Sequence, residues 1–212
     1  MLPRAKHWSV PLGIGLLVIV IAAMGERGRE AFEYLGPLAS SSPSPHRWIT
    51  GHFTHIGWSH SALNLAGLLS VWFVYGRVFS QSLWLTFIIG CTFGISLGFH
   101  FFSPQITYYV GLSGLLHGML SAASGSALLG SILRPQAANP AQNEVQMERR
   151  EIKWEELLVF GGVWAKVAYE QLIGSVPLTA EIAGGPVVID AHLYGACLGT
   201  IVAVLPRFWR KS

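Results

Sequence analysis

Charge is what this 212-residue chain has least of. Asp, Glu, Lys and Arg together make up 12% of the residues, whereas hydrophobic residues make up 51%. Soluble globular domains carry about 25% charged residues. The composition therefore excludes an ordinary soluble enzyme of this size and a disordered chain, and the formal net charge of +3 does not suggest a nucleic-acid partner. We expect an integral membrane protein with a single domain, residues 1–212.

Cysteine is scarce as well. Cys91 and Cys197 both lie inside apolar stretches without a metal-ligand spacing, and they are predicted to be small buried hydrophobic side chains. His52, His55 and His60 lie near one another, but no H-E-x-x-H pattern occurs and no carboxylate lies beside them. The sequence therefore predicts neither a metal nor a cofactor.

In place of charge the chain has six apolar stretches, at residues 8–25, 59–78, 83–103, 112–133, 156–175 and 186–206. Each is close to the ~20 residues that a helix needs to cross a bilayer. A backbone in lipid must satisfy its own hydrogen bonds, and the period-two alternation of a membrane β-barrel is absent. The prediction is an all-α membrane protein with six transmembrane helices.

The basic residues predict the orientation. With both termini in the cytoplasm, ten of the fourteen Lys and Arg residues lie on the cytoplasmic side. Arg27, Arg29 and Arg47 lie on the opposite side, and Lys166 lies within the fifth stretch. The first stretch also has the features of a signal peptide with a cleavage site at residues 23–25, and its removal would leave five spans in the same orientation.

Two segments are predicted to lie outside the spans. Residues 26–58 have a mixed composition with a Ser/Pro stretch, which is typical of an outer interfacial loop with turns and short helices. Residues 134–153 are polar and contain two prolines, which indicates a flexible cytoplasmic connection.

Polar residues inside a span are costly, so each one is a hypothesis for function. His60 and Asn64 lie four residues apart and share one face of the second span. Their structural interpretation is an interfacial histidine and an asparagine that bonds between helices. Ser113 opens the fourth span between Gly111 and Gly114. The pattern is not the G-x-S-x-G of soluble hydrolases, and a lone serine in such a place is commonly structural.

The sixth span carries His192 near its start. Two rows of small residues at nearly regular four-residue spacing favour close packing of this span on the fourth. The rows are Ala191, Gly195, Gly199 and Ala203 on the sixth span, and Gly114, Gly118, Ala122, Ser126 and Gly130 on the fourth. If the rows face each other, Ser113 and His192 meet at a similar depth.

That meeting would create a serine nucleophile with a histidine base. His60 and Asn64 could then donate hydrogen bonds to an oxyanion. No acidic third member is predicted, because Asp190 points to another face and is interpreted as a residue at the start of the span.

Three further polar residues have competing interpretations. His117 is a rival base, but its place one turn after the serine favours packing near the catalytic histidine. Lys166 and Glu170 are interpreted as an intrahelical pair, and as polar groups inside a span they are also a hypothesis for function.

The motifs H-x-x-x-N at residues 60–64, G-x-S-G at 111–114 and A-H-x-x-G-x-x-x-G at 191–199 resemble those of the rhomboid family of intramembrane serine proteases. The resemblance covers residues 8–209. It implies that Ser113 is the nucleophile and His192 the base, and that His60, Asn64 and the Ser113 backbone N–H line an oxyanion hole. His46 stands where the family often has tryptophan, and His117 where it often has tyrosine.

Residues 52–68 and 111–118 are most similar to the rhombosortase subfamily. This implies removal of a C-terminal tail, made of Gly-Gly, an apolar span and basic residues, from exported proteins. The implied location is the inner membrane of a Gram-negative bacterium, where the lipid bilayer surrounds the chain. The site would face the periplasm. Three alternatives stay open: a general rhomboid protease, a transpeptidase that resolves the acyl-enzyme with an amine, and an inactive rhomboid-like binding protein.

Overall fold

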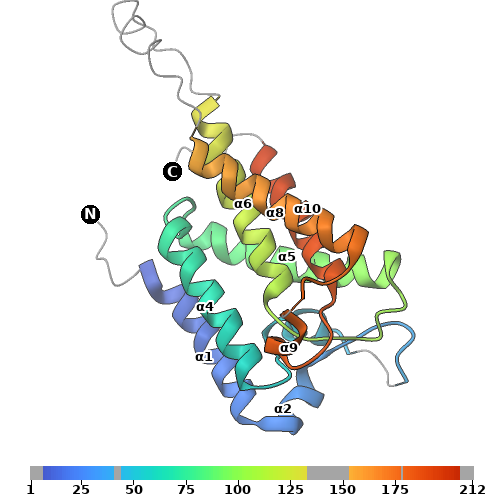
Figure 1. Cartoon of the computed structure of the whole chain (residues 1–212). Helices are drawn as coiled ribbons and strands as arrows, with labels where there is room; N and C mark the ends of the chain where they lie inside the picture. The colour runs from blue at the N-terminus through green and yellow to red at the C-terminus, as the bar shows by residue number, and fades with distance from the viewer. Residues whose placement is uncertain (1–6, 41–43, 133–152, 178, 206–212) are drawn as a thin grey trace, which may run out of the picture.

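The structure is a computed structural model that describes residues 7–40, 44–132, 153–177 and 179–205. It is mostly helical. One longer helix lies within or close to each of the six apolar stretches: α1 (Ser9–Ala23), α4 (Trp58–Tyr75), α5 (Gln81–Phe102), α6 (Ser113–Ile132), α8 (Trp154–Ile173) and α10 (Ile189–Val204). In Figure 1, α1 and α4 lie side by side, and α6, α8 and α10 form a second group.

By length and composition, only part of the six-span prediction is supported. Among the described residues, α5 and α6 are long and apolar enough to cross a membrane, and α1 with α2 (Gly25–Phe32) would make a third span despite a bend of 117° between them. α10 is apolar but has only 16 residues. Large apolar side chains are nevertheless exposed, including Phe73 and Leu172. Such exposure is unusual in a soluble monomer and indicates a membrane protein.

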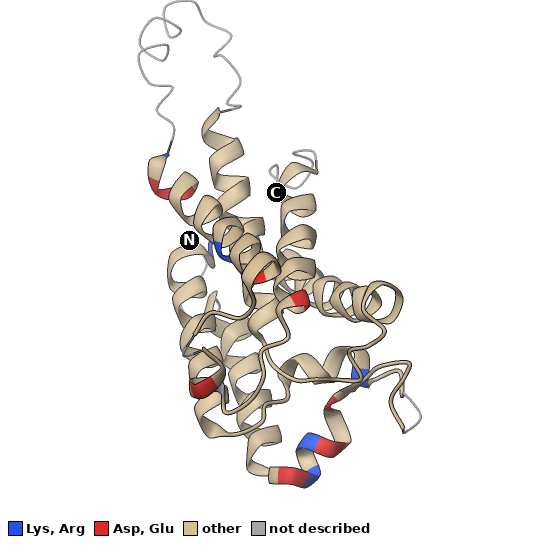
Figure 2. Ribbon diagram, turned by 45° about the vertical axis from the view of Figure 1, so that its right-hand side comes forward, with Lys and Arg blue, Asp and Glu red and all other residues tan. Residues whose placement is uncertain are grey.

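Most of the Lys and Arg residues that predicted the orientation lie outside the described residues. Residues 134–152 of the predicted cytoplasmic connection also lie outside them. Among the charged residues that are described, Figure 2 shows a group on α2, the short helix at the lower end of the molecule. Gly25 has φ +62° at the break between α1 and α2. Glycine adopts this left-handed conformation without steric cost, so it suits the sharp turn.

The segment predicted as an outer loop does contain short helices, α2, α3 (Arg47–Thr50) and a 3-10 turn at Gly51–Phe53. It also contains a strand that the sequence did not predict. β1 (Tyr34–Leu35) pairs antiparallel with β2 (Tyr108–Tyr109). Two-residue strands are too short to give an alternation signal. The pairing joins this segment to the chain just before Ser113.

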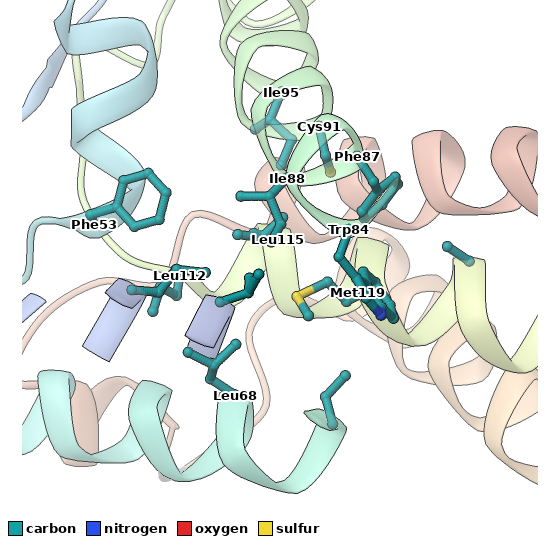
Figure 3. Packing of buried hydrophobic residues seen from close by; sticks show 14 of the residues in the cluster. Phe53, Leu68, Trp84, Phe87, Ile88, Cys91, Ile95, Leu112, Leu115 and Met119 are labelled. Carbon is teal, nitrogen blue, oxygen red and sulfur yellow. The ribbon is translucent and has the colours of Figure 1, made fainter. Parts of the chain in front are cut away.

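The hydrophobic core lies where α4, α5 and α6 meet the segment that precedes α4, which contains Phe53. Figure 3 shows Phe53, Leu68, Trp84, Leu115 and Met119 around a common centre, and all five side chains are buried. α5, the helix that contains Trp84, has an N-cap at Ser80, whose hydroxyl accepts a hydrogen bond from the Leu83 N–H at 3.3 Å. This packing fixes the start of α6, where Ser113 lies.

Candidate active site

Ser113 is the first residue of α6, and the turn before it is held on several sides. Gly111 has φ +127°, and a Cβ added there would lie 3.0 Å from the His60 ring. The Gly111 N–H donates to the Gly51 carbonyl at 3.1 Å, and the Tyr109 hydroxyl donates to the Gly111 carbonyl at 2.6 Å. Both the conformation and the close ring therefore require glycine here.

Packing of α6 on α10 brings His192 to this turn. A Cβ added to Gly195 would lie 2.0 Å from the Gly114 carbonyl oxygen, and one added to Gly199 would lie 2.1 Å from the Gly118 carbonyl oxygen. Only glycine allows backbones to approach so closely. At Gly114 and Gly118 the two rows of small residues therefore face each other, which supports the close packing predicted from their spacing, whereas Ala203 lies against Gly125 rather than against the predicted Ser126.

The contact between serine and histidine follows from this packing. His192 Nε2 lies 3.0 Å from Ser113 Oγ, and the histidine is buried. This is hydrogen-bond distance for an O–H that donates to a ring nitrogen. A serine whose proton can pass to a neighbouring imidazole is activated as a nucleophile.

The other nitrogen of the histidine meets a carboxylate that the sequence did not assign to the site. His192 Nδ1 lies 2.7 Å from Glu170 Oε2. On the other side, Lys166 Nζ lies 2.7 Å from Glu170 Oε1 and 3.3 Å from His192 Nδ1. The predicted intrahelical pair is therefore present, but it also faces α10. The signal that could have revealed this was a carboxylate deep in an apolar stretch.

The rival base, His117, is placed as the packing interpretation predicted. Its ring stacks on that of His192, with centroids 4.1 Å apart and planes 18° apart. His117 Nδ1 lies 2.7 Å from the Ser113 carbonyl oxygen, so this nitrogen is a donor to the backbone. The hydroxyl of Ser113 instead contacts His192, so of the two rings it is His192 that is placed to accept the serine proton.

His60 and Asn64 lie on one buried face of α4, but they are not equivalent. The His60 ring lies against Gly111, as the contact to an added Cβ shows. Asn64 Nδ2 donates to the His60 carbonyl oxygen at 3.1 Å. The His55 ring packs edge-on against His60, with centroids 4.8 Å apart. Burial, with His60 nearby, lowers the pKa of His55 to about 3, so His55 is neutral at pH 7.

We expect turnover to slow when the side chain of either His60 or Asn64 is removed. His60→Ala and Asn64→Ala should each lower kcat by about 10²–10³-fold if each donates to an oxyanion. Because the His60 ring also supports Gly111, the histidine variant should have the larger effect. Steady-state cleavage rates measure this, and an unchanged rate in the double variant would leave both residues with a structural role only.

Tyr109 is a second residue that the sequence did not reveal. Its hydroxyl interacts with the Ser113 side chain and the Gly114 backbone in addition to its bond with Gly111. Burial raises the pKa of the Tyr109 phenol, so the hydroxyl keeps its proton. His52 packs against the Tyr109 ring at a centroid distance of 5.1 Å. The Tyr109 phenol therefore holds the turn at residues 111–114, at the start of α6, in place.

Four other residues considered in the sequence lie outside the site and have contacts or burial typical of structural residues. Asp190 accepts a hydrogen bond from Ser103 Oγ at 2.5 Å, which places it away from the histidine. Arg47 donates to the Glu33 carbonyl oxygen at 3.2 Å, so it contacts the backbone of its own segment. Cys91 is buried, as predicted, and Cys197 is partly buried.

Among the residues that the structure describes, one group has donor atoms close enough for a cation. His117, Glu170 and His192 offer atoms within 4.8 Å of one another. Both nitrogens of His192 are already engaged by Ser113 and Glu170, and Glu170 pairs with Lys166. The two rings are nearly parallel, so their lone pairs do not converge on one point. The arrangement suits proton transfer better than metal binding.

Comparison of the chain with models of protein families and with curated proteins found no match. The case for a function therefore depends on the sequence motifs and on the geometry of the site.

Proposed function

We propose that this chain is an intramembrane serine protease. The observation that carries the proposal is the 3.0 Å contact between Ser113 Oγ and His192 Nε2, formed between two helices of an apolar chain. The motifs on α4, α6 and α10 support the same class, since their order and spacing resemble the rhomboid family. Within that class we assign the chain to the rhombosortase type, which removes C-terminal Gly-Gly tails.

The chemistry starts with the histidine as base. Ser113 Oγ attacks the carbonyl carbon of the scissile bond while its proton moves to His192 Nε2. The oxyanion is stabilised by the Ser113 N–H, which belongs to the first turn of α6 where N–H groups have no partner within the helix, and by the side chains of His60 and Asn64. His192 then gives its proton to the leaving amine as the scissile C–N bond breaks, which leaves an acyl-serine. Water attacks the acyl carbon while its proton passes to His192 Nε2, the ester bond to Ser113 Oγ breaks, and the proton returns to Oγ, so that the product has a free carboxylate.

The membrane arrangement is part of the proposal. The six longer helices cross or enter the bilayer, both termini lie in the cytoplasm, and the site near the start of α6 opens to the periplasm. The exposed apolar side chains and the positive-inside pattern of the sequence support this arrangement. A substrate with a basic tail would insert with its C-terminus inside, so its Gly-Gly would lie at the periplasmic boundary, level with Ser113.

Glycine in the substrate has two effects. Each glycine costs about 1 kcal/mol in a helix relative to alanine, so a Gly-Gly pair unwinds readily. A helical peptide bond must unwind before it reaches a nucleophile, because its N–H and C=O groups are otherwise paired. Glycine also removes side chains that would clash near the close contact of α6 and α10. Substrate choice thus follows from backbone freedom and from space.

A substrate substitution tests the assignment. We expect that changing Gly-Gly to Leu-Leu in a tail-anchored substrate will block processing, whereas changing Leu to Ile deep in its span will have little effect. Co-expression with the enzyme, followed by immunoblotting for the mature form, measures this. The Ser113→Ala enzyme with the Gly-Gly substrate is the control. Equal processing of the Leu-Leu substrate would leave a general rhomboid protease.

The mature C-terminus separates hydrolysis from transfer. Mass spectrometry of the processed substrate should show a free carboxylate, because water resolves the acyl-enzyme. An added amine-bearing group at that terminus would instead assign the chain as a transpeptidase.

A further inference from the structure

Glu170 differs from every other acidic residue that the structure describes. Only 1% of its side chain is exposed, and it is a buried residue of α8, a largely apolar helix. A carboxylate at such a depth is costly unless its oxygens are paired. Both partners of Glu170 belong to the site region: His192 at 2.7 Å and Lys166 at 2.7 Å.

We propose that Glu170 is the third member of a Ser–His–Glu triad, with Lys166 as the residue that holds its carboxylate. The proposal deepens the protease function and rests on it. Glu170 does not touch the substrate. It acts through His192, so it is a positioning residue.

The contact with Glu170 determines the tautomer of His192. A carboxylate only accepts hydrogen bonds, so at 2.7 Å the His192 Nδ1 must carry the proton. Nε2 is then unprotonated in the neutral ring and faces Ser113 Oγ at 3.0 Å. This is the tautomer that can accept the serine proton. Without Glu170 the ring could carry its proton on Nε2 and would be unable to act as base.

Glu170 also lies beside the positive charge that forms on His192 during the reaction. When the serine proton reaches Nε2, the ring becomes an imidazolium in a buried place. The Glu170 carboxylate, in contact with Nδ1, stabilises that cation directly. A buried charge without such a partner would raise the barrier.

Lys166 holds the carboxylate of Glu170 in place. Its ammonium binds Glu170 Oε1, while Oε2 faces the histidine, so the two contacts fix the rotation of the carboxylate. Lys166 is itself about one-third exposed, with 34% of its side chain accessible. It balances the charge of Glu170 in the resting enzyme. Since Nδ1 is already protonated, the 3.3 Å approach of Lys166 Nζ to it contributes no hydrogen bond.

The competing interpretation is that Glu170 only ties α8 to α10. The two roles differ in what conservative variants do. Glu170→Gln keeps the size and can still form a hydrogen bond, but it loses the charge and permits the wrong tautomer. Glu170→Asp keeps the charge but shortens the side chain. A triad predicts more activity for Asp than for Gln, and a purely structural tie predicts the reverse.

The experiment uses the full-length enzyme in detergent with a Gly-Gly tail substrate. We expect Glu170→Gln to lower kcat by about 10³–10⁴-fold with KM unchanged, as for loss of the acid in a known triad. Glu170→Asp should retain more activity than Glu170→Gln. Lys166→Met should lower kcat less than Glu170→Gln, because the histidine keeps its carboxylate.

A matched control lies on the same helix. Glu156 accepts a hydrogen bond from the Tyr75 hydroxyl at 2.8 Å, far from the serine in the chain. Glu156→Gln makes the same chemical change on α8 and should leave kcat close to the wild-type value, because Glu156 contacts neither Ser113 nor His192.

Histidine ¹⁵N spectra of the wild-type enzyme give a measurement that does not depend on whether any Glu170 variant folds. The His192 signal is assigned by difference with His192→Asn. At neutral pH we expect the Nδ1–H tautomer, and an Nε2–H tautomer would overturn the triad. Wild-type kcat in a folded Glu170→Gln enzyme would also overturn it.

The failure of the triad is distinguishable from the failure of the protease function. Cleavage retained by Ser113→Ala would remove the serine protease altogether. An inactive Ser113→Ala enzyme together with a fully active Glu170→Gln enzyme would instead leave a Ser–His dyad.

Discussion

Replacing either Ser113 or His192 with alanine should abolish cleavage and leave the helical fold intact. The two side chains form one hydrogen-bonded unit at 3.0 Å, so the loss of either removes proton transfer as well as attack. In a serine protease the loss of the nucleophile or of its base costs about 10⁶-fold in kcat. For the same reason the double variant should be no slower than either single variant.

Cleavage of a Gly-Gly tail substrate measures the rate, and labelling by a fluorophosphonate reports the nucleophile without any need for substrate binding. Circular dichroism and thermal unfolding in detergent check the fold. Ser113 is only partly buried at the start of α6, so its loss should leave the melting temperature nearly unchanged. Normal turnover by Ser113→Ala would remove the serine as nucleophile.

The pairing of Ser113 with His192 could be predicted from the sequence because small residues at four-residue spacing mark the face of each helix. Two such faces on two apolar helices leave few ways to pack, and each way fixes which residues meet. The structure has this arrangement, with Gly195 and Gly199 against the backbone of α6.

The role of Glu170 could not be predicted in the same way. The i,i+4 spacing shows that Lys166 and Glu170 share a face of α8, but it does not show where that face points. The rotation of α8 depends on packing with α6 and α10 rather than on its own sequence. Contacts between α8 and both of these helices place the carboxylate beside His192.

The support around Gly111 was hidden for a different reason. Tyr109 lies in a two-residue strand whose partner, Tyr34, is distant in the chain. Pairing at such a separation is specified by the tertiary fold, and neither strand is long enough to show a period. The number of membrane spans was also only partly supported, because α10 is short and α8 carries charged residues within its apolar length.

Enlarging the glycines of α10 should also lower the cleavage rate strongly, even though no reacting atom changes. A Cβ at Gly199 would lie 2.1 Å from the Gly118 carbonyl oxygen and 2.9 Å from the Ala122 nitrogen. Both neighbours are backbone atoms of α6, so neither can rotate away as a side chain could. α10 must therefore move away from α6, and His192 must move with it.

A displacement of about 1 Å at a catalytic group can cost about 10²-fold in rate. We therefore expect Gly199→Ala to lower kcat by at least about 10²-fold and Gly199→Val to lower it further. Gly195→Val should behave similarly, since its Cβ would lie 2.0 Å from the Gly114 carbonyl oxygen. Fluorophosphonate labelling of Ser113 should fall together with turnover, because the base has moved away from the hydroxyl.

The control is a glycine in another helix with free space around it. An added Cβ at Gly90, on α5, has no neighbouring atom within 4 Å apart from its own helix backbone and chain neighbours. Gly90→Val makes the same change of residue type and should leave kcat and labelling unchanged. Kinetics, labelling and thermal unfolding of the variants therefore separate a general effect of valine in a helix from the loss of close packing. Full activity with normal stability in Gly195→Val and Gly199→Val would mean that α10 does not pack on α6 through these glycines, and that His192 reaches Ser113 by another arrangement.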